Sequence, residues 1–326
     1  MGRLEALLEK NEYLVADGAT GTVLMAAGLQ HGDPPEEWNA IHPDRVRNMH
    51  QGYIDAGSNI ILTNSFGGTR FRLKLHGLQD RATELNRAAA QIARSTADDA
   101  PRVIAVAGSI GPSGEILAPL GDLSFEDAKA GFAEQAAALT EGGADVLWIE
   151  TMSDLNEVRA AIEGSQEASD LPIVVTMTFD TNGYTMMGVS PAGAVTELMA
   201  YGPLAIGGNC GNGPDEIEGV IQGMYAVDQS IPLVAKSNAG MPVLINGVAT
   251  YNAGPVAMAE YAVRLRNMGA TIIGACCGST PEHIRMMVDL LDNTPLEREQ
   301  PRTNIIEEQP KGAKRERRHQ RARRRK

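Results

Sequence analysis

The three cysteines of this chain are the residues whose type and position best suit chemistry. Cys210 ends one apolar run, and the adjacent pair Cys276 and Cys277 ends another. Three thiolates that converge on one point suit zinc, which binds sulfur tetrahedrally, and three protein ligands leave a fourth position for a substrate. Spacing alone leaves two alternatives open, namely buried cysteines that only pack in a core and a strained disulfide within the adjacent pair. An odd number of cysteines in 326 residues argues against a disulfide framework and for a reducing compartment.

Eight apolar, strand-like segments alternate with amphipathic, helix-like ones, and these elements must position the cysteines. The strand-like segments are 14–18, 59–66, 102–109, 145–151, 172–179, 204–210, 232–238 and 271–277, and helices are expected at 43–56, 80–97, 124–142, 153–167, 214–228 and 255–268. Most strand-like segments are continuously apolar, as expected of parallel strands covered on both faces. Eight such units predict an α/β fold, a single (β/α)8 TIM barrel. A doubly wound sheet is the alternative, but the first turn, Asp17-Gly-Ala-Thr-Gly21, lacks the glycine spacing typical of that fold.

In a TIM barrel the active site lies at the carboxyl ends of the strands. All three cysteines fall at such ends, together with a short set of polar residues and one aromatic residue. That set is Asp17, Thr63, Asn64, Phe66, Ser109, Glu150, Asp180, Asn209 and Asn238. Adjacent cysteines need a bend to point the same way, because side chains alternate within a strand. Gly278, which follows the pair, permits that bend.

Six motifs at these positions carry a family resemblance. They are Asp17-Gly-Ala-Thr-Gly-Thr22, Thr63-Asn-Ser-Phe-Gly67, Ile149-Glu-Thr151, Gly208-Asn-Cys-Gly211, Ser237-Asn-Ala-Gly240 and Gly274-Ala-Cys-Cys-Gly-Ser-Thr280. From residue 12 to about 291 the chain resembles the homocysteine S-methyltransferase family, which includes betaine-dependent enzymes and the homocysteine module of cobalamin-dependent methionine synthase. The resemblance implies a (β/α)8 barrel and a zinc ion on Cys210, Cys276 and Cys277.

The resemblance also implies a reaction. A zinc-bound homocysteine thiol is deprotonated by the metal, and the thiolate attacks a methyl group in line to give methionine, so no catalytic residue beyond this thiolate is needed. Glu150 and Asp17 are expected to bind the α-ammonium group, and backbone N–H groups of the turn from Gly18 to Gly21 the α-carboxylate. The further expected substrate residues are Thr63, Asn64 and Phe66, with Asn238 or a water on the zinc when substrate is absent.

The methyl donor is the open part of this interpretation. Residues 292–326 are too few for a corrinoid or folate domain, so we expect a free small donor or a cofactor on a separate corrinoid protein. A quaternary ammonium donor requires an aromatic cage. The candidates for that cage are Trp38, in the loop after the first strand, with Phe66, Phe71 and Tyr184.

Two departures from the betaine enzymes bear on the choice of methyl donor. Gly67 and Thr151 stand where animal-type betaine enzymes carry tyrosines, so the chain is closer to the methionine synthase module. Glycine betaine, or another methylated ammonium or sulfonium compound, is still the favoured donor. The alternatives are a split methionine synthase subunit that takes methyl from a separate methylcobalamin protein, and a non-catalytic zinc- and homocysteine-binding protein.

Charge is unevenly distributed along the chain. The net charge is −12, yet residues 311–326 contain ten Lys and Arg and a single acid, Glu316. We therefore expect a barrel domain over 1–295 and a disordered basic tail over 296–326. The tail has no aromatic residue to stack on bases, so nucleic-acid binding is not expected. No apolar run is long enough for a membrane helix, which favours a cytoplasmic protein, and the oligomeric state stays open.

Overall fold

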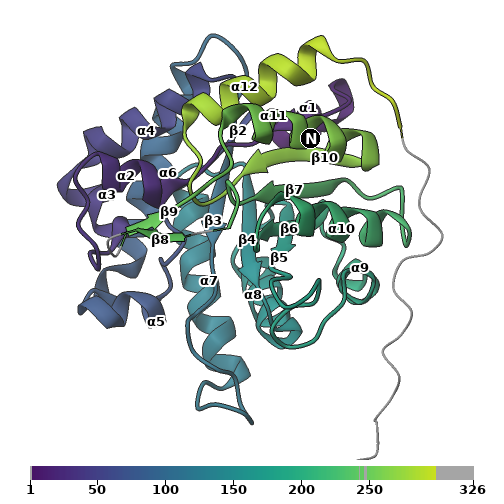
Figure 1. The fold of residues 1–326 in the computed structure, drawn as a ribbon. Coiled ribbons are helices and arrows are strands. Elements are labelled where there is room, and N and C mark those ends of the chain that lie inside the picture. Colours follow the sequence, from purple (N-terminus) through teal and green to yellow (C-terminus); the bar gives the residue numbers. More distant parts are fainter. Residues whose placement is uncertain (1, 242, 246–247, 299–326) are drawn as a thin grey trace, which may run out of the picture.

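The strands form one closed parallel barrel, as predicted (Figure 1). The computed structural model describes residues 2–241, 243–245 and 248–298. The barrel strands are β1 (Leu14–Val15), β2 (Ile60–Leu62), β3 (Ala105–Ile110), β4 (Val146–Met152), β5 (Ile173–Met177), β6 (Ala205–Cys210), β7 (Leu233–Ser237) and β10 (Ala270–Ala275). Their order around the sheet is β1-β10-β7-β6-β5-β4-β3-β2, and a parallel bridge between Ala16 and Ile60 closes it. All eight predicted strands are present, so the prediction of a TIM barrel is confirmed.

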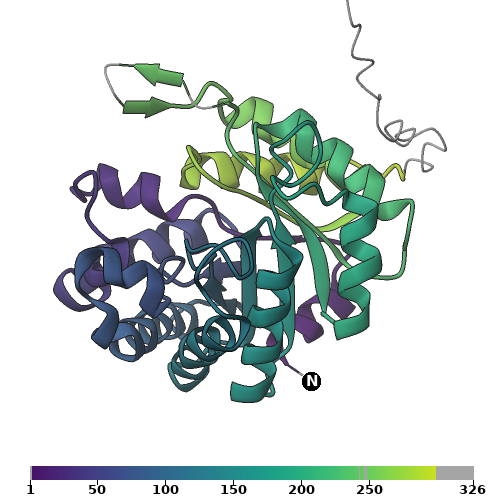
Figure 2. The same cartoon turned by 90° about the horizontal axis from the view of Figure 1, so that it is seen from below.

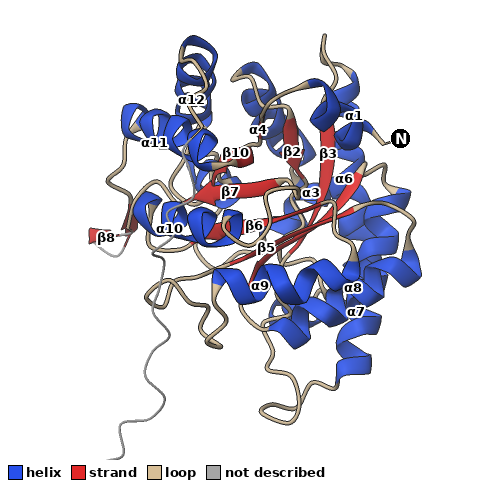
Figure 3. Ribbon diagram, turned by 90° about the vertical axis from the view of Figure 1, so that its right-hand side faces the viewer, coloured by secondary structure: helices blue, strands red, loops and turns tan. Residues whose placement is uncertain are grey.

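Helices surround the barrel on the outside (Figure 3). The longer ones are α1 (Arg3–Lys10), α2 (Thr20–Ala26), α4 (Pro43–Asp55), α6 (Ala82–Asp98), α7 (Phe125–Glu141), α8 (Leu155–Ala168), α9 (Pro191–Leu198), α10 (Pro214–Tyr225), α11 (Pro255–Met268) and α12 (Pro281–Asn293). Short helical turns are η1 (Pro35–Glu37), α3 (Trp38–Ile41), α5 (Arg70–Leu73), η2 (Lys74–His76), η3 (Gln79–Arg81) and η4 (Met199–Tyr201). Several helices begin with proline at the first turn, where its missing N–H costs nothing.

Alternation along the strands separates an apolar layer from a polar layer inside the barrel. Trp148 of β4 and Val234 of β7 belong to the apolar interior, which Leu4 of α1 also joins from the amino-terminal end. Side chains repeat their direction every second residue in a strand. The inward residues two positions further along are therefore Glu150 and Lys236, which places charges above the apolar layer.

Two features differ from the expectation or were not predicted. Strands β1 and β2 are shorter than expected, because a carboxylate oxygen of Asp17 accepts the Leu62 N–H at 2.7 Å in place of further ladder pairing. An antiparallel hairpin, β8 (Val243–Ile245) and β9 (Val248–Thr250), projects from the loop after β7 and stands away from the barrel in Figure 2.

The predicted basic tail lies mostly outside the described residues, since the structure describes the chain up to residue 298. The expected division at residue 295 therefore stays a prediction. Within the described ranges, no helix combines the length and apolar character needed to cross a bilayer.

Candidate thiol and substrate site

A cavity of about 450 Å³ opens at the carboxyl ends of the strands, where the polar layer faces solvent. Its walls come from the loops after β1 and β2 and from the ends of β3, β4, β6, β7 and β10. The lining residues are Gly18–Thr22, Gly32–Glu36, Leu62–Gly67, Arg72, Leu73, His76, Ser109, Glu150, Thr151, Cys210, Lys236, Cys276 and Cys277. The volume is typical of a small-molecule site.

The three cysteines converge in this cavity. Their sulfur atoms lie within 4.8 Å of one another, and those of Cys210 and Cys276 are 2.9 Å apart. Strand β10 ends at Ala275, so Cys276 and Cys277 lie in the following turn rather than in the strand, and alternation no longer separates them. Gly278 has a φ of 81°, and a side chain there would overlap the ring of Tyr251. The bend expected at Gly278 is therefore present.

Backbone strain marks the same place. Cys210, the last residue of β6, and Thr151, near the end of β4, have φ values of 60° and 63°. A non-glycine residue in this left-handed region costs about 1–3 kcal/mol and persists where surrounding structure holds it. Asn209 helps to stabilise this backbone conformation at Thr151, because its Oδ1 accepts the Thr151 N–H at 2.8 Å and its Nδ2 donates to Thr151 Oγ1 at 2.7 Å. Strain of this kind is typical of a functional site.

The three thiols differ in pKa. Hydrogen bonds from Cys210 and Cys276, with a further one from the Tyr251 hydroxyl, hold the pKa of Cys277 well below its usual range although burial opposes this. Hydrogen bonds with Cys276 and Cys277, together with burial, raise the pKa of Cys210. For Cys276 the hydrogen bond with Cys210 lowers the pKa, but the one with Cys277 and burial outweigh it and leave the pKa raised. The cluster thus already favours a sulfur anion among the three thiols. Zinc accepts thiolate ligands in tetrahedral sites, so three sulfur donors at this spacing fit the metal.

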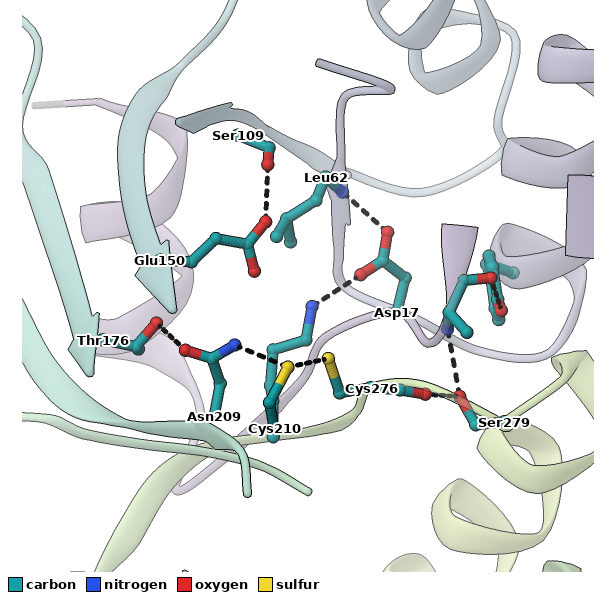
Figure 4. A network of polar contacts seen from close by, with 12 residues as sticks. Asp17, Leu62, Ser109, Glu150, Thr176, Asn209, Cys210, Cys276 and Ser279 are labelled. Carbon is teal, nitrogen blue, oxygen red and sulfur yellow. Dashed lines mark hydrogen bonds and ion pairs between the residues drawn. The ribbon is translucent and has the colours of Figure 1, made fainter. Parts of the chain in front are cut away.

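A buried charge network lies beside the thiols (Figure 4). Lys236 donates from Nζ to Asp17 Oδ1 at 3.0 Å, and the other Asp17 oxygen accepts the Leu62 N–H. Glu150 accepts a hydrogen bond from the Ser109 hydroxyl, and its carboxylate points toward the same space as that of Asp17. The side chains of Lys236 and Asp17 are 3% and 1% exposed, so this is an ion pair shielded from water.

Burial and neighbouring charges shift the pKa values of Glu150 and Lys236 in opposite directions. Burial raises the pKa of Glu150 to about 7, with Lys236 opposing the rise and Cys276 adding to it. For Lys236, burial lowers the pKa, but the carboxylates of Asp17 and Glu150 outweigh it and leave the pKa above its ordinary value. The lysine is therefore charged, while Glu150 changes its charge near neutral pH.

The expected substrate residues divide into two groups. Gly18, Thr63, Asn64, Phe66 and Glu150 line the cavity together with the three cysteines. Asp17, Asn238 and Trp38 do not line it.

Asp17 and Asn238 lie behind the cavity wall, where their polar atoms already have partners. Asp17 reaches the cavity only through Lys236. Asn238 accepts the Cys277 N–H at 3.0 Å and donates to the Gly211 carbonyl at 2.7 Å. Its amide therefore links the end of β6 to the turn that carries Cys277. The expectation that Asn238 or a water completes the zinc coordination stays a prediction.

The expected aromatic cage is reduced to a single residue. Trp38 is 4% exposed and packs in the apolar core, with His42 edge-on to its ring at 4.8 Å and Arg45 over it at 4.9 Å. Phe71 and Tyr184 also do not line the cavity. Phe66 is the one cage candidate that does, at 37% exposure. Trp38 was expected in the cage because it lies in the loop after the first strand. A large apolar ring is, however, also stabilised by burial, and here it packs against α4.

Lys236 and Tyr251 are among the residues at the site that were not predicted. Lys236 stands in an apolar strand-like run, Leu233-Val-Ala-Lys-Ser237, and a charge there was a signal of a special environment. Tyr251 follows the hairpin strand β9 and reaches Cys277 through its hydroxyl. No periodicity in the sequence marks that contact.

The fold and site define a TIM-barrel protein with a thiol-rich candidate metal centre, and comparison with known proteins identifies its family. The homocysteine S-methyltransferase family model matches residues 14–291. The chain therefore belongs to the homocysteine S-methyltransferase family.

Individual relatives agree with this membership. Methionine synthases from Mycobacterium tuberculosis and Mycobacterium leprae are each 33% identical over 86% of this chain, which spans only about a quarter of their length. Among solved structures, the metallated form of the homocysteine methyltransferase MmuM from Escherichia coli is 25% identical, with a TM-score of 0.75 over 90% of this chain and 100% of that one.

Proposed function

We propose that this protein is a zinc-dependent homocysteine S-methyltransferase that forms methionine with a small methylated ammonium or sulfonium donor, glycine betaine first among them. The observation that carries the proposal is the convergence of Cys210, Cys276 and Cys277 beside Glu150 in a single cavity. Zinc held by these thiols would supply a Lewis acid that keeps the homocysteine sulfur as a thiolate at neutral pH.

The chain's own residues bind and orient the substrate in this proposal. Glu150 accepts the α-ammonium group, and Ser109 and Lys236 hold the Glu150 carboxylate toward the cavity. The N–H groups of the Gly18–Gly21 turn that remain free would bind the α-carboxylate, since that of Ala19 already donates to Ser279 Oγ at 3.0 Å. In the transfer, the homocysteine sulfur forms a bond to the methyl carbon while the methyl–nitrogen bond breaks, and the nitrogen keeps the electron pair, so betaine yields dimethylglycine.

The direct test uses the full chain, purified with zinc and a reductant, then given homocysteine and glycine betaine. We expect methionine and dimethylglycine in equal amounts. Dimethylsulfonioacetate and S-methylmethionine form the second arm. Methionine from none of these donors, from protein that holds zinc and binds homocysteine, would contradict the proposed donor class.

A second candidate donor is supported by the relatives. Because the matched relatives are methionine synthases, a separate methylcobalamin protein is the alternative methyl source. Methylcobalamin added to the same assay separates the two, since only this alternative predicts turnover with it. Zinc and homocysteine binding without methionine from any donor would leave the non-catalytic binding protein. We also propose a cytoplasmic location, which keeps the thiols reduced, and cell fractionation tests it.

Glu150 gives the proposal a pH dependence. Its pKa is about 7 in the folded protein against an ordinary value of 4.5, so the folded state keeps a proton that the unfolded chain releases between these pH values. This group therefore lowers stability as pH rises through that window. Because the ammonium group binds the carboxylate, homocysteine binding below pH 7 should release a proton from Glu150 in addition to the thiol proton.

The Glu150→Gln variant tests this coupling. We expect homocysteine affinity to fall about 10- to 100-fold at pH 8, because a charge-assisted hydrogen bond is lost. We also expect proton release at pH 6 to fall from about two to about one per homocysteine, measured by calorimetry in buffers of different ionisation enthalpy. Glu141→Gln, on the exposed end of α7, is the control. Unchanged proton release in Glu150→Gln would rule out this role.

A further inference from the structure

We propose that Arg72 binds the carboxylate of the methyl donor, so that the donor is a zwitterion with its methylated cation toward the thiols and its anionic group at Arg72. This inference rests on the proposed function and assigns a residue to donor recognition. It concerns the end of the cavity formed by the loops after β1 and β2, which homocysteine bound at Glu150 and the thiols leaves available.

Arg72 is a cavity residue without a fixed partner for its charge. Its side chain is half-buried and lines the cavity. Arg70, two residues earlier, pairs with Glu134 at 2.7 Å, and Arg81 pairs with Glu84 at 2.7 Å. The guanidinium of Arg72 makes no hydrogen bond or ion pair within 4 Å with any residue that the structure describes. A planar five-donor group held this way suits a bidentate carboxylate.

The loop after β3 fixes the direction of this side chain. A Cβ at Gly114 would lie 2.7 Å from Arg72 Cδ, so the arginine stem crosses the loop where a side chain is missing. Gly114 has a φ of 80°, which also favours glycine. The loop is itself anchored, because Ser113 N donates to the buried Glu157 carboxylate at 2.8 Å. The arginine is therefore placed by packing before any ligand arrives.

The same loop also supports an aromatic ring of the cavity. A Cβ at Gly111 would lie 2.6 Å from the Phe66 ring, so the ring rests on Gly111 three residues before the arginine crosses Gly114. Phe66 is exposed to the cavity, and an aromatic face attracts a methylated cation. The Phe66 ring and the Arg72 guanidinium therefore pack against the same short loop. The ring suits the methylated cation of a small zwitterion, and the guanidinium suits its carboxylate.

Negative groups at this end of the cavity favour a zwitterion over a simple anion. Asp33 and Glu36 line the cavity with Arg72, and His76 lies at the same end. Burial raises the pKa of the Glu36 carboxyl, while the Gly67 N–H that it accepts at 2.6 Å and the nearby charge of Arg72 oppose the rise. A ligand with only negative charge would be repelled by these carboxylates, whereas a cation within the ligand is attracted to them.

The test compares the wild-type protein with Arg72→Met, both loaded with zinc and homocysteine, in calorimetric titrations with glycine betaine. Lys74→Met, an exposed residue of η2 outside the cavity, is the matched control. We expect Arg72→Met to bind glycine betaine about 10- to 100-fold more weakly, the loss of a charge-assisted contact. Tetramethylammonium, which lacks the carboxylate, should bind both proteins equally. Homocysteine affinity should also be unchanged.

Each other outcome has a distinct meaning. Equal betaine affinity in wild type and Arg72→Met overturns the inference, as does a wild type that binds none of glycine betaine, dimethylsulfonioacetate and S-methylmethionine. If Arg72→Met instead weakens the binding of homocysteine, Arg72 binds the amino acid, and that result also overturns the inference. Weaker betaine binding in Arg72→Met, from a wild type that forms no methionine, supports the subsite while contradicting the proposed function.

Discussion

Replacing Cys276 with serine is expected to remove both bound zinc and methionine formation. Cys276 lies at the centre of the site, 2.9 Å from Cys210 and within 4.8 Å of Cys277, so its loss leaves two sulfur donors. A serine hydroxyl is a far weaker zinc ligand than a thiolate, and an unactivated homocysteine thiol is mostly protonated at neutral pH. We expect metal content to fall from one per chain to near zero and the rate to fall at least about a thousandfold.

The three cysteines should behave as one unit. Cys210→Ser and Cys277→Ser are expected to give the same losses, and the double variant Cys210→Ser, Cys276→Ser to be no worse than either single change. Metal analysis, far-UV circular dichroism and the methionine assay on each variant separate lost metal from lost fold. Methionine formation that continues after zinc is lost would refute the metal-based mechanism.

The fold could be read from the sequence because its signals are local. Each strand-like run, such as 172–179 or 204–210, is continuously apolar, and each is followed by an amphipathic segment. Parallel strands that are buried on both faces require this pattern, so eight repeats specify the barrel. The β8–β9 hairpin was not foreseen, since it interrupts a βα connection and contributes no strand to the barrel.

The site was predictable wherever chemistry follows strand ends. The cysteines and Glu150 were found because the carboxyl ends of all strands meet at the same rim. Trp38 was misplaced, because a loop position does not say whether a large ring turns inward to the core or toward the cavity. Arg72 and Tyr251 reach the site through tertiary packing against Gly114 and Gly278, which no local pattern encodes.

Lys236 is the clearest example of a contact that no local sequence pattern encodes. Its replacement is also expected to have the largest effect on stability. Its partner Asp17 is 219 residues away in sequence, and the pairing depends on β10 lying between β1 and β7. Replacing Lys236 with methionine keeps the stem volume but leaves Asp17 and Glu150 without their buried counter-charge. Breaking a buried pair in this way costs about 3–5 kcal/mol, so we expect the free energy of unfolding of Lys236→Met to fall by that amount at pH 8.

The loss in Lys236→Met should depend on pH with a defined sign. Without the ammonium group, the folded-state pKa values of Asp17 and Glu150 rise further above their ordinary values of 3.8 and 4.5. The folded state then holds protons that the unfolded chain releases, so the deficit grows as pH rises above about 4 and is smallest in acid. Urea titrations at pH 5 and pH 8 measure it. The control is Lys129→Met, which removes a less buried ion pair with Glu167.

A compensating change separates charge from packing. In the double variant Asp17→Asn, Lys236→Met, the amide still accepts the Leu62 N–H while the unpaired charge is gone, so part of the lost stability should return. No recovery, together with a deficit that is equal at pH 5 and pH 8, would mean that Lys236 stabilises the barrel through the packing of its stem and not through its charge. Recovery would show that the loss of stability comes from the charge left unpaired on Asp17, and therefore that the ion pair itself stabilises this part of the barrel.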